Sequence, residues 1–326
     1  MKSSMTQATQ RGMIIRYAKF HPPVSQVRPL KTNYKLMKQV FILLFLLMAS
    51  FVPNESDQKH KSFREDFSKS RLNNFRYGST GANVDFKHKI GISSPSERKT
   101  KILSFKLNPD EIAGPGKGPE IITKHFTHFG TYSTRLKVPN ATKKQPNVGA
   151  VVGYFTYHED DQDGLSEIDF EWLLADPRII YVGTWTGEHG KLQRIGRIIN
   201  LAEGKIIETI SKVGFDGTPT RLTGSQNIPE SIPAIENFDA SSQFHTYGFD
   251  WESDRLRWWM LHPETADTLV LWDYQGSQLG IPQHASKYRM NFWHTKDWAV
   301  EGKPNSLEKP EFPFELEVDW MEYKEK

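Results

Sequence analysis

One short stretch constrains the fold of this chain more than any other, because charged and apolar residues alternate along it. Residues 167–174 read Glu-Ile-Asp-Phe-Glu-Trp-Leu-Leu. A repeat of two is the period of a β-strand, in which successive side chains point to opposite faces. In a strand, Glu167, Asp169 and Glu171 therefore share one face, while the apolar residues between them face a core.

Three carboxylates on one face of a strand repel one another. Their clustering is unfavourable unless a ligand, a cation or a proton relieves it. A solvated strand edge and a hard-cation site are two simple interpretations of the pattern. It also suits catalysis by paired carboxylates, and the spacing by itself leaves all three interpretations open.

The rest of the chain is a series of short apolar runs separated by Gly, Pro, Asn and Asp. Since no long helical pattern lies between the runs, they predict an all-β sandwich rather than alternating βαβ units. Segment 202–240 is less regular, with a possible strand at 206–210 and a loop at 229–237. The other predicted strands are Ile102–Leu107, Gly130–Val138, Val148–Tyr157, Ile179–Trp185, Phe244–Trp251, Leu256–Leu261, Leu269–Tyr274, Tyr288–Trp293 and Phe314–Tyr323.

The composition is that of a globular protein and excludes several classes of function. The chain has 326 residues, 37% of them hydrophobic, which is enough apolar material for one large core. Its 42 basic and 39 acidic residues give a net charge of +3, and neither sign forms a long block. Nothing in this pattern indicates nucleic-acid binding. The absence of cysteine excludes disulfides, thiol catalysis and thiolate metal sites.

The N-terminal part contains a segment that resembles a secretory signal. Lys38 precedes an apolar run at residues 40–49, and Pro53 follows shortly after it. The run is too short for a comfortable membrane span, so we expect it to be a signal, with translation starting at Met37. An internal signal-anchor is the alternative.

These features predict the organisation of the chain and its location. We expect residues 1–59 to form an N-terminal extension with the signal-like segment at about 37–53, and residues 60–326 to form one domain. Polar residues 54–70 have the character of a linker into that domain. The mature protein is expected to be secreted, periplasmic or at the cell surface, without a stable membrane span.

Two carboxylates on one strand face suit glycoside hydrolysis with retention, in which one attacks the anomeric carbon and the other protonates the leaving oxygen. On a flat strand the Cα atoms of Glu167 and Glu171 would lie roughly 13 Å apart, so a bent, concave sheet is needed to bring the headgroups together. Carbohydrate clefts also need aromatic faces. The chain supplies nine Trp and eleven Tyr residues, many of them on the predicted strands.

Several longer segments, taken in order, resemble glycoside hydrolase family 16, the group of endo-β-glucanases, galactanases and xyloglucan transferases. The resemblance covers roughly residues 60–326. Besides the acidic strand, the segments that carry it are Gly130–Pro139, Val151–Tyr157, Phe244–Trp251 with Arg257–Trp259 after it, Met290–Trp293 and Val318–Trp320.

The resemblance implies a jelly-roll sandwich of two curved antiparallel sheets with a concave substrate cleft. It implies that Glu167 is the nucleophile, Asp169 its assisting acid and Glu171 the general acid/base of a retaining glycosidase. It implies a polysaccharide as the partner, no required cofactor and a monomer. Residues that match sugar-contacting positions, or lie in the last aromatic run, are Glu120, Tyr157, Trp185, Asn291, Trp293 and Trp298.

The substrate signatures are mixed. The acidic strand has the regular form found in lichenases and xyloglucan transferases, without the extra bulge residue usual in laminarinases. Leu165 stands where lichenases usually have Trp, and residues 293–299 are closer to the transferase version. We therefore expect an endo-acting β-glucanase, with 1,3-1,4-glucan favoured. A transglycosylase on xyloglucan or another glucan and a non-catalytic carbohydrate-binding sandwich are the alternatives.

Two further groups of residues have possible metal-binding interpretations. The acidic loop at residues 158–163 could be a structural calcium loop, although a solvated connection is the favoured interpretation. His245 and His294 could form a metal pair, although single histidines on mixed strands are more often packing residues. We therefore assign no metal ligand from the sequence.

Overall fold

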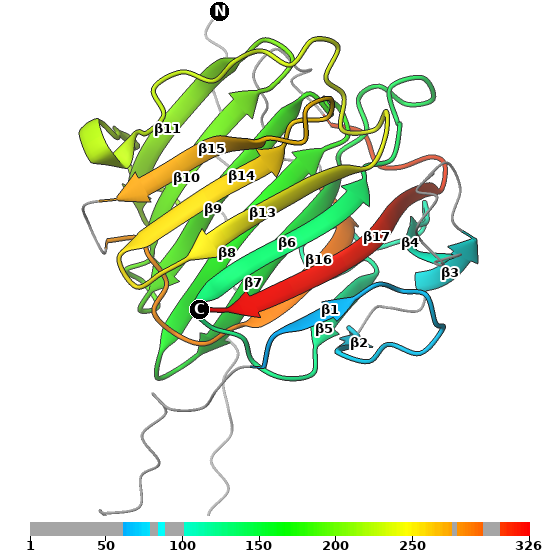
Figure 1. The fold of residues 1–326 in the computed structure, drawn as a ribbon, viewed down its shortest axis with the longest axis horizontal. Helices are drawn as coiled ribbons and strands as arrows, with labels where there is room; N and C mark the ends of the chain where they lie inside the picture. The colour runs from blue at the N-terminus through cyan, green and yellow to red at the C-terminus, as the bar shows by residue number, and fades with distance from the viewer. Residues whose placement is uncertain (1–60, 79–83, 89–100, 276–278, 296–306) are drawn as a thin grey trace, which may run out of the picture. The chain divides into compact units, whose positions relative to one another are not determined.

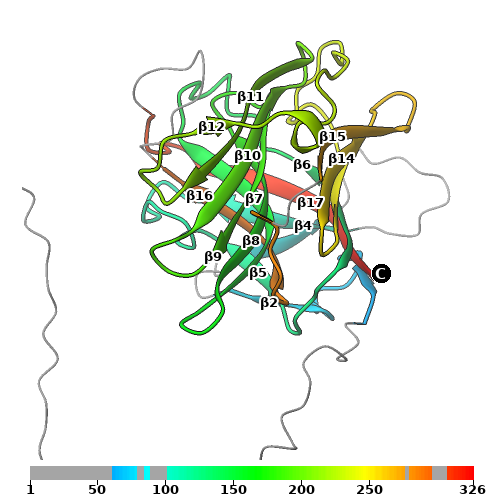
Figure 2. The ribbon, with the colours of Figure 1, turned by 90° about the vertical axis from the view of Figure 1, so that its left-hand side faces the viewer.

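The computed structural model describes residues 61–78, 84–88, 101–275, 279–295 and 307–326. These residues form two antiparallel sheets that lie face to face (Figure 1; Figure 2 shows them from the side). The signal-like segment and Trp298 lie outside the described residues. Within the described part of the chain, no helix has the length and apolar character that crossing a membrane requires.

The first sheet has eight strands among the described residues, and it occupies the front of Figure 1. Its C-terminal strand, β17, pairs with three other strands, which are β6, β4 and β1. The order is β15 (Thr268–Gln275), β14 (Arg255–Leu261), β13 (His245–Trp251), β6 (Gly130–Lys137), β17 (Phe314–Glu325), β4 (Lys101–Leu107) and β3 (Val84–His88), with β1 (Phe63–Glu65) on β17.

The second sheet has nine strands among the described residues, and the acidic stretch lies in its centre. The order is β12 (Thr220–Arg221), β11 (Lys205–Val213), β10 (Gln193–Asn200), β9 (Ile179–Gly187), β8 (Gly164–Leu173), β7 (Ala150–Asp160), β16 (Lys287–His294), β5 (Glu120–Thr123) and β2 (Phe75–Tyr77). A short 3₁₀ turn, η3 (Gly224–Gln226), follows β12.

The space between the sheets is filled by apolar and aromatic side chains. Ile168, Phe170 and Trp172 of β8 are fully buried there, as the alternation of the sequence predicts. Trp258 of β14 stacks on Trp272 at 4.9 Å between ring centroids, and its Nε1 donates a hydrogen bond of 3.1 Å to the backbone oxygen of Asp169. The core therefore connects the first sheet directly to the strand that carries the three acids.

The all-β prediction is confirmed, and each strand predicted from alternation overlaps an observed strand. The expected linker at 54–70 is wrong in part, because it contains β1. Phe63 in this strand packs against Phe75 at 5.6 Å and Tyr323 at 6.0 Å between ring centroids. A three-residue strand is too short to show a periodic pattern, so its pairing depends on partners far away in the sequence.

Candidate active site

The three acids of β8 lie in a regular ladder. β8 pairs without a register shift with β7 on one side and with β9 on the other. Glu167 lies between Tyr157 and Trp185, and Glu171 lies between Gly153 and Tyr181. Since a bulge would turn one acid to the other face, the regular pairing keeps all three on the outer face of the sheet.

This outer face is hollowed into a cleft of about 620 Å³, which we call the acidic cleft. Its lining comes from β5, β16, β7, β8 and β9, which is four strand spacings or about 19 Å across the sheet. All the predicted site residues within the described part of the chain line it: Glu120, Tyr157, Glu167, Asp169, Glu171, Trp185, Asn291 and Trp293. The fold thus brings together residues from five strands.

Burial raises the pKa of every acid on this strand. The pKa of Glu167 rises from 4.5 to about 8, first because burial disfavours its charge and then because Glu171 is close, while Arg289 opposes the rise. The pKa of Glu171 rises from 4.5 to about 7 through burial, against the attraction of Arg194. Burial also raises the pKa of Asp169, and its two neighbouring carboxylates add to this. The cluster therefore retains protons at neutral pH, as a site that needs both an acid and a carboxylate requires.

Arg289 connects several groups on one side of the acidic cleft. Its Nη1 lies 3.3 Å from Oε1 of Glu120, and its guanidinium carbon lies 4.8 Å from the ring centroid of Tyr157. Burial raises the pKa of Glu120 even though Arg289 favours its charged form. The Tyr157 hydroxyl donates a hydrogen bond to Glu159, which also lines the cleft. This side is therefore a network of charged and hydrogen-bonding groups.

Asn291 is a polar residue in the lining of the acidic cleft. Its side chain is buried, and its Oδ1 has no hydrogen-bond partner among the described residues. The same oxygen would lie 2.4 Å from a Cβ atom at position 153, so only glycine fits there without displacing it. A buried acceptor without a partner is unfavourable for folding.

The opposite side of the acidic cleft is aromatic and basic. Trp185 and Phe215 lie 4.7 Å apart between ring centroids, and Phe215 is 69% exposed. Arg194 and Lys212 lie 5.3 and 5.5 Å from the Trp185 centroid. Arg194 also lines a smaller hollow that shares Asp169, Glu171 and Trp185 with the cleft.

Three residues of the cleft region were not predicted from the sequence: Arg289, Arg194 and Phe215. Arg289 had a usable signal, because it precedes Asn291 by two residues and so shares its strand face. Arg194 lies opposite Trp185 in the β9–β10 pairing, which requires knowing the register. Phe215 lies in the connection after β11, where no periodicity exists to assign it.

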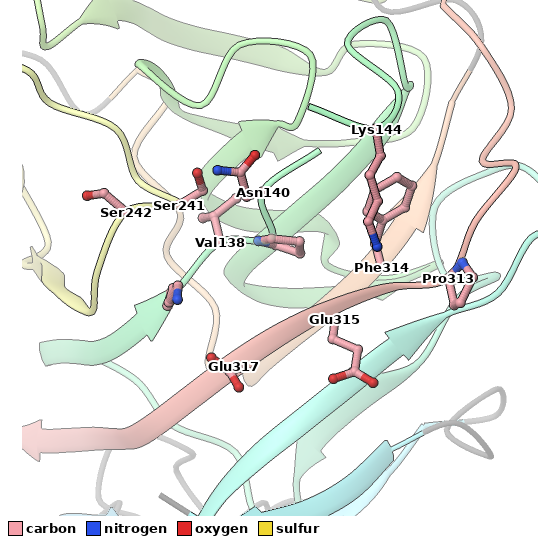
Figure 3. Close-up of a pocket in the computed structure, with 11 residues that line it drawn as sticks. Val138, Asn140, Lys144, Ser241, Ser242, Pro313, Phe314, Glu315 and Glu317 are labelled. Atoms are coloured by element: carbon pink, nitrogen blue, oxygen red, sulfur yellow. The ribbon is translucent and has the colours of Figure 1, made fainter. Parts of the chain in front are cut away.

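Other candidate groups do not join this site. His245 and His294 do not form a metal pair, since the Nε2 of His245 contacts the backbone oxygen of Asp239 and that of His294 contacts Glu111. A second hollow, of about 600 Å³, lies where β6 ends and β17 begins (Figure 3). It is lined by Lys137, Val138, Pro139, Asn140, Lys144, Ser241, Ser242, Pro313, Phe314, Glu315 and Glu317. None of these residues belongs to the carboxylate strand.

Comparison with known proteins identifies the family. A β-glucanase of Paenibacillus macerans is 32% identical over 267 residues, which cover 78% of this chain and 75% of that protein. The chain belongs to glycosyl hydrolase family 16. The sequence model of this family matches residues 222–322, which begin after β12 and end within β17. The three acids on β8 are consistent with a glycosidase of this family. The fold is a jelly-roll sandwich with a concave cleft.

Other relatives of this family 16 chain match over different lengths. A β-glucanase of Bacillus licheniformis is 21% identical over 89% of this chain and 98% of its own length. One from Acetivibrio thermocellus is 27% identical over 55% of this chain, which spans only 38% of that relative. A solved lichenase from a mouse hindgut metagenome has a TM-score of 0.48 at 17% identity, covering 82% of this chain and all of the other.

Proposed function

We propose that the protein is a retaining endo-β-glucanase that hydrolyses a β-linked polysaccharide by double displacement. The observation that carries this proposal is the regular row of Glu167, Asp169 and Glu171 in a cleft where burial raises their pKa values. Such a row keeps protons at neutral pH, as retaining hydrolysis requires of its acid. Since the pKa of Glu167 (about 8) lies above that of Glu171 (about 7), Glu167 must lose its proton before it attacks.

In the first step, a carboxylate oxygen of Glu167 attacks the anomeric carbon, and the bond to the leaving oxygen breaks. Glu171 gives its proton to that oxygen, so the leaving chain departs as an alcohol. Asp169 lies between the two acids and would share a proton with Glu167. In the second step, Glu171 takes a proton from water, which attacks the anomeric carbon and releases Glu167.

An internal segment of a glucan is the substrate class that best fits the cleft. Its lining crosses five strands, which gives room for sugar rings on both sides of the carboxylates. The Asn291 side chain, the Arg289–Glu120 pair and the Trp185–Phe215 pair provide polar and aromatic groups in the lining. The unbulged β8 favours a 1,3-1,4-glucan over a laminarin-type 1,3-glucan. Secretion by the signal-like segment would bring the enzyme to this substrate.

The test is reducing-sugar release from lichenan, laminarin, xyloglucan and agarose by the purified chain. We expect the largest rate with lichenan, an early fall in its viscosity because internal bonds break first, and β-anomeric products by NMR. Glu167→Gln is the inactive control. Release from none of the four by a folded protein, or α-anomeric first products, would overturn the proposal.

A transglycosylase is the second candidate, and it uses the same two carboxylates. The observation that favours it is the transferase-like run beginning at Trp293, a residue that lines the cleft. The two activities differ in whether water or a sugar hydroxyl releases Glu167. Incubating the enzyme with glucan and excess labelled oligosaccharide distinguishes them, since a transferase incorporates label into long products and a hydrolase shortens them.

A further inference from the structure

A cluster of imidazole and carboxylate groups lies at the end of the β7–β8 hairpin, outside the row of three acids. His158 Nε2 is 3.1 Å from Asp160 Oδ2 and 3.4 Å from Asp163 Oδ2. The candidate ligand atoms of these three residues all lie within 4.8 Å of one another. His284, from the segment before β16, places Nδ1 3.6 Å from the same Asp163 oxygen. Three potential metal ligands therefore converge in the hairpin, and His284 approaches one of them, Asp163, from a segment far away in the sequence.

The spacing of these atoms suits a tetrahedral transition-metal site. Zinc bonds to His nitrogen and carboxylate oxygen are 2.0–2.2 Å long, so neighbouring ligand atoms in a tetrahedron lie about 3.3–3.6 Å apart. Three of the six ligand separations in such a site are 3.1, 3.4 and 3.6 Å here, close to that range. A calcium site would need six to eight oxygen ligands, and two imidazoles make this cluster a poor one.

The rest of the hairpin holds Asp160 in a ligating orientation. Its Oδ1 accepts hydrogen bonds from the backbone N–H of Gln162 at 2.9 Å and of Asp163 at 2.5 Å. These bonds fix the carboxylate and leave Oδ2 as the oxygen that faces His158. A ligand held in this way loses little rotational freedom when it binds an ion.

The segment that carries His284 is also fixed. Its backbone oxygen accepts hydrogen bonds from Ser166 Oγ at 3.1 Å and from Ser286 Oγ at 2.9 Å. Ser166 belongs to β8, immediately before Glu167. The imidazole itself is 44% exposed, and its Nδ1 approaches Asp163.

We propose that His158, Asp160, Asp163 and His284 bind a zinc-type divalent cation that joins the β7–β8 hairpin to the segment before β16. When the ion binds, four metal–ligand bonds replace the partly exposed ion pairs among these side chains. Binding stabilises the folded chain, because the unfolded chain does not hold these residues together. The site neighbours the acidic cleft through Glu159, yet it does not use the three acids, so it is independent of the proposed function.

The test is calorimetric titration of the tag-free, EDTA-treated full chain with Zn²⁺, compared with Ca²⁺ and Mg²⁺. We expect one zinc ion per chain, an increase in the unfolding temperature on adding zinc, and no comparable effect of calcium or magnesium. Co²⁺ should give the visible absorption bands of tetrahedral nitrogen and oxygen coordination. No zinc binding, or calcium binding as tight as zinc, would overturn the proposal.

Variants locate the ion. His158→Gln and Asp163→Asn should each weaken zinc binding by about tenfold or more, and His284→Gln by a similar or smaller factor. His189→Gln is the matched control, since this imidazole lies beside the same hairpin, with Nε2 near the backbone oxygen of Asp160 and Nδ1 near Glu159, and is not in the ligand set. Unchanged zinc affinity in folded His158→Gln and Asp163→Asn, or equal loss in His189→Gln, would assign the ion elsewhere and contradict the site.

Discussion

The two faces of β8 have opposite chemistry although they belong to the same ten residues. The inner face carries Ile168, Phe170 and Trp172, which are fully buried in the core. The outer face carries the three acids, each only partly covered. A strand of alternating character thus divides its side chains between stabilising the fold and lining the acidic cleft.

This difference shows where the strand gains and loses stability. Phe170 stacks on Trp172 at 5.3 Å between ring centroids, and such burial favours the folded state. On the other face, burial raises the pKa of Glu167 and Glu171, so folding disfavours their charged forms. The stability gained by burying the inner face therefore has to offset the stability lost by burying the acids of the outer face. Such a balance is typical of sites under functional constraint.

Removing a carboxylate from the outer face should have the largest effect on activity. We expect Glu167→Gln to lower kcat by more than about 10³-fold, because the amide cannot form the glycosyl-enzyme. Glu171→Gln should lower kcat by about 10²–10⁴-fold through loss of proton transfer. Initial rates on lichenan measure both effects, and near-normal unfolding temperatures show that the variants are folded.

Azide distinguishes the roles of the two acids. In Glu167→Ala, azide should replace the nucleophile and give an α-glycosyl azide from an activated β-glycoside. In Glu171→Ala, the covalent intermediate still forms, so azide should give the β-glycosyl azide. The reverse pattern would exchange the two assignments.

Changing the inner face should affect stability rather than chemistry. Phe170→Ala removes a fully buried ring, and we expect a loss of about 3–5 kcal/mol in the free energy of unfolding. Denaturant titration followed by tryptophan fluorescence measures it. Phe170→Leu keeps most of the volume and serves as the control. A loss below about 1 kcal/mol for Phe170→Ala would show that this face contributes less than its burial suggests.

The local pattern of β8 was predictable from the sequence, and so were several residues on neighbouring strands that line the acidic cleft with it. Alternation alone assigns the acids to one face and Ile168 to the other. The positions of Tyr157 and Asn291 in the cleft were expected from the family resemblance rather than from periodicity. The resemblance also carried the roles of the acids, which the geometry leaves to experiment.

What the sequence left open depends on contacts between distant segments. A solvated connection was the favoured interpretation of the acidic loop at 158–163, because the sequence of the loop does not by itself define which residues would be ligands. The imidazole of His284, more than a hundred positions later, becomes a neighbour only when β16 pairs with β7. Phe215 was missed for a similar reason, since a connection between strands has no period to indicate which surface it covers.

The outer face should make stability depend on pH. The pKa of Glu167 is about 8 in the folded chain and ordinarily 4.5, so the folded state binds more protons between these values. Stability therefore falls as pH rises through that window. Buried His245, whose pKa is lowered to about 4, makes stability rise with pH between 4 and 6.5. Its contribution is the same in the parent and in a Glu167 variant, so it cancels when the two are compared.

We expect Glu167→Gln to be more stable than the parent chain at pH 8, by up to about 4 kcal/mol, and to differ little at pH 4.5. Urea unfolding at both pH values measures the difference. An equal difference at the two pH values would mean that the charge of Glu167 is not the cause.

The smallest effect on stability is expected when the Phe→Ala change made at Phe170 is repeated at Phe215, on the side of the acidic cleft. Phe215→Ala removes a ring that is 69% exposed and contacts Trp185 at the edge of the acidic cleft. Since little area is lost from the core, the free energy of unfolding should change by less than about 0.5 kcal/mol. If the ring contacts sugar, kcat/KM on lichenan should fall by about two- to tenfold, mainly through KM. The same Phe→Ala change would then separate the two faces, with stability lost at position 170 and substrate affinity at position 215. A fall in stability comparable to that of Phe170→Ala would contradict this division, because it would make Phe215 part of the core.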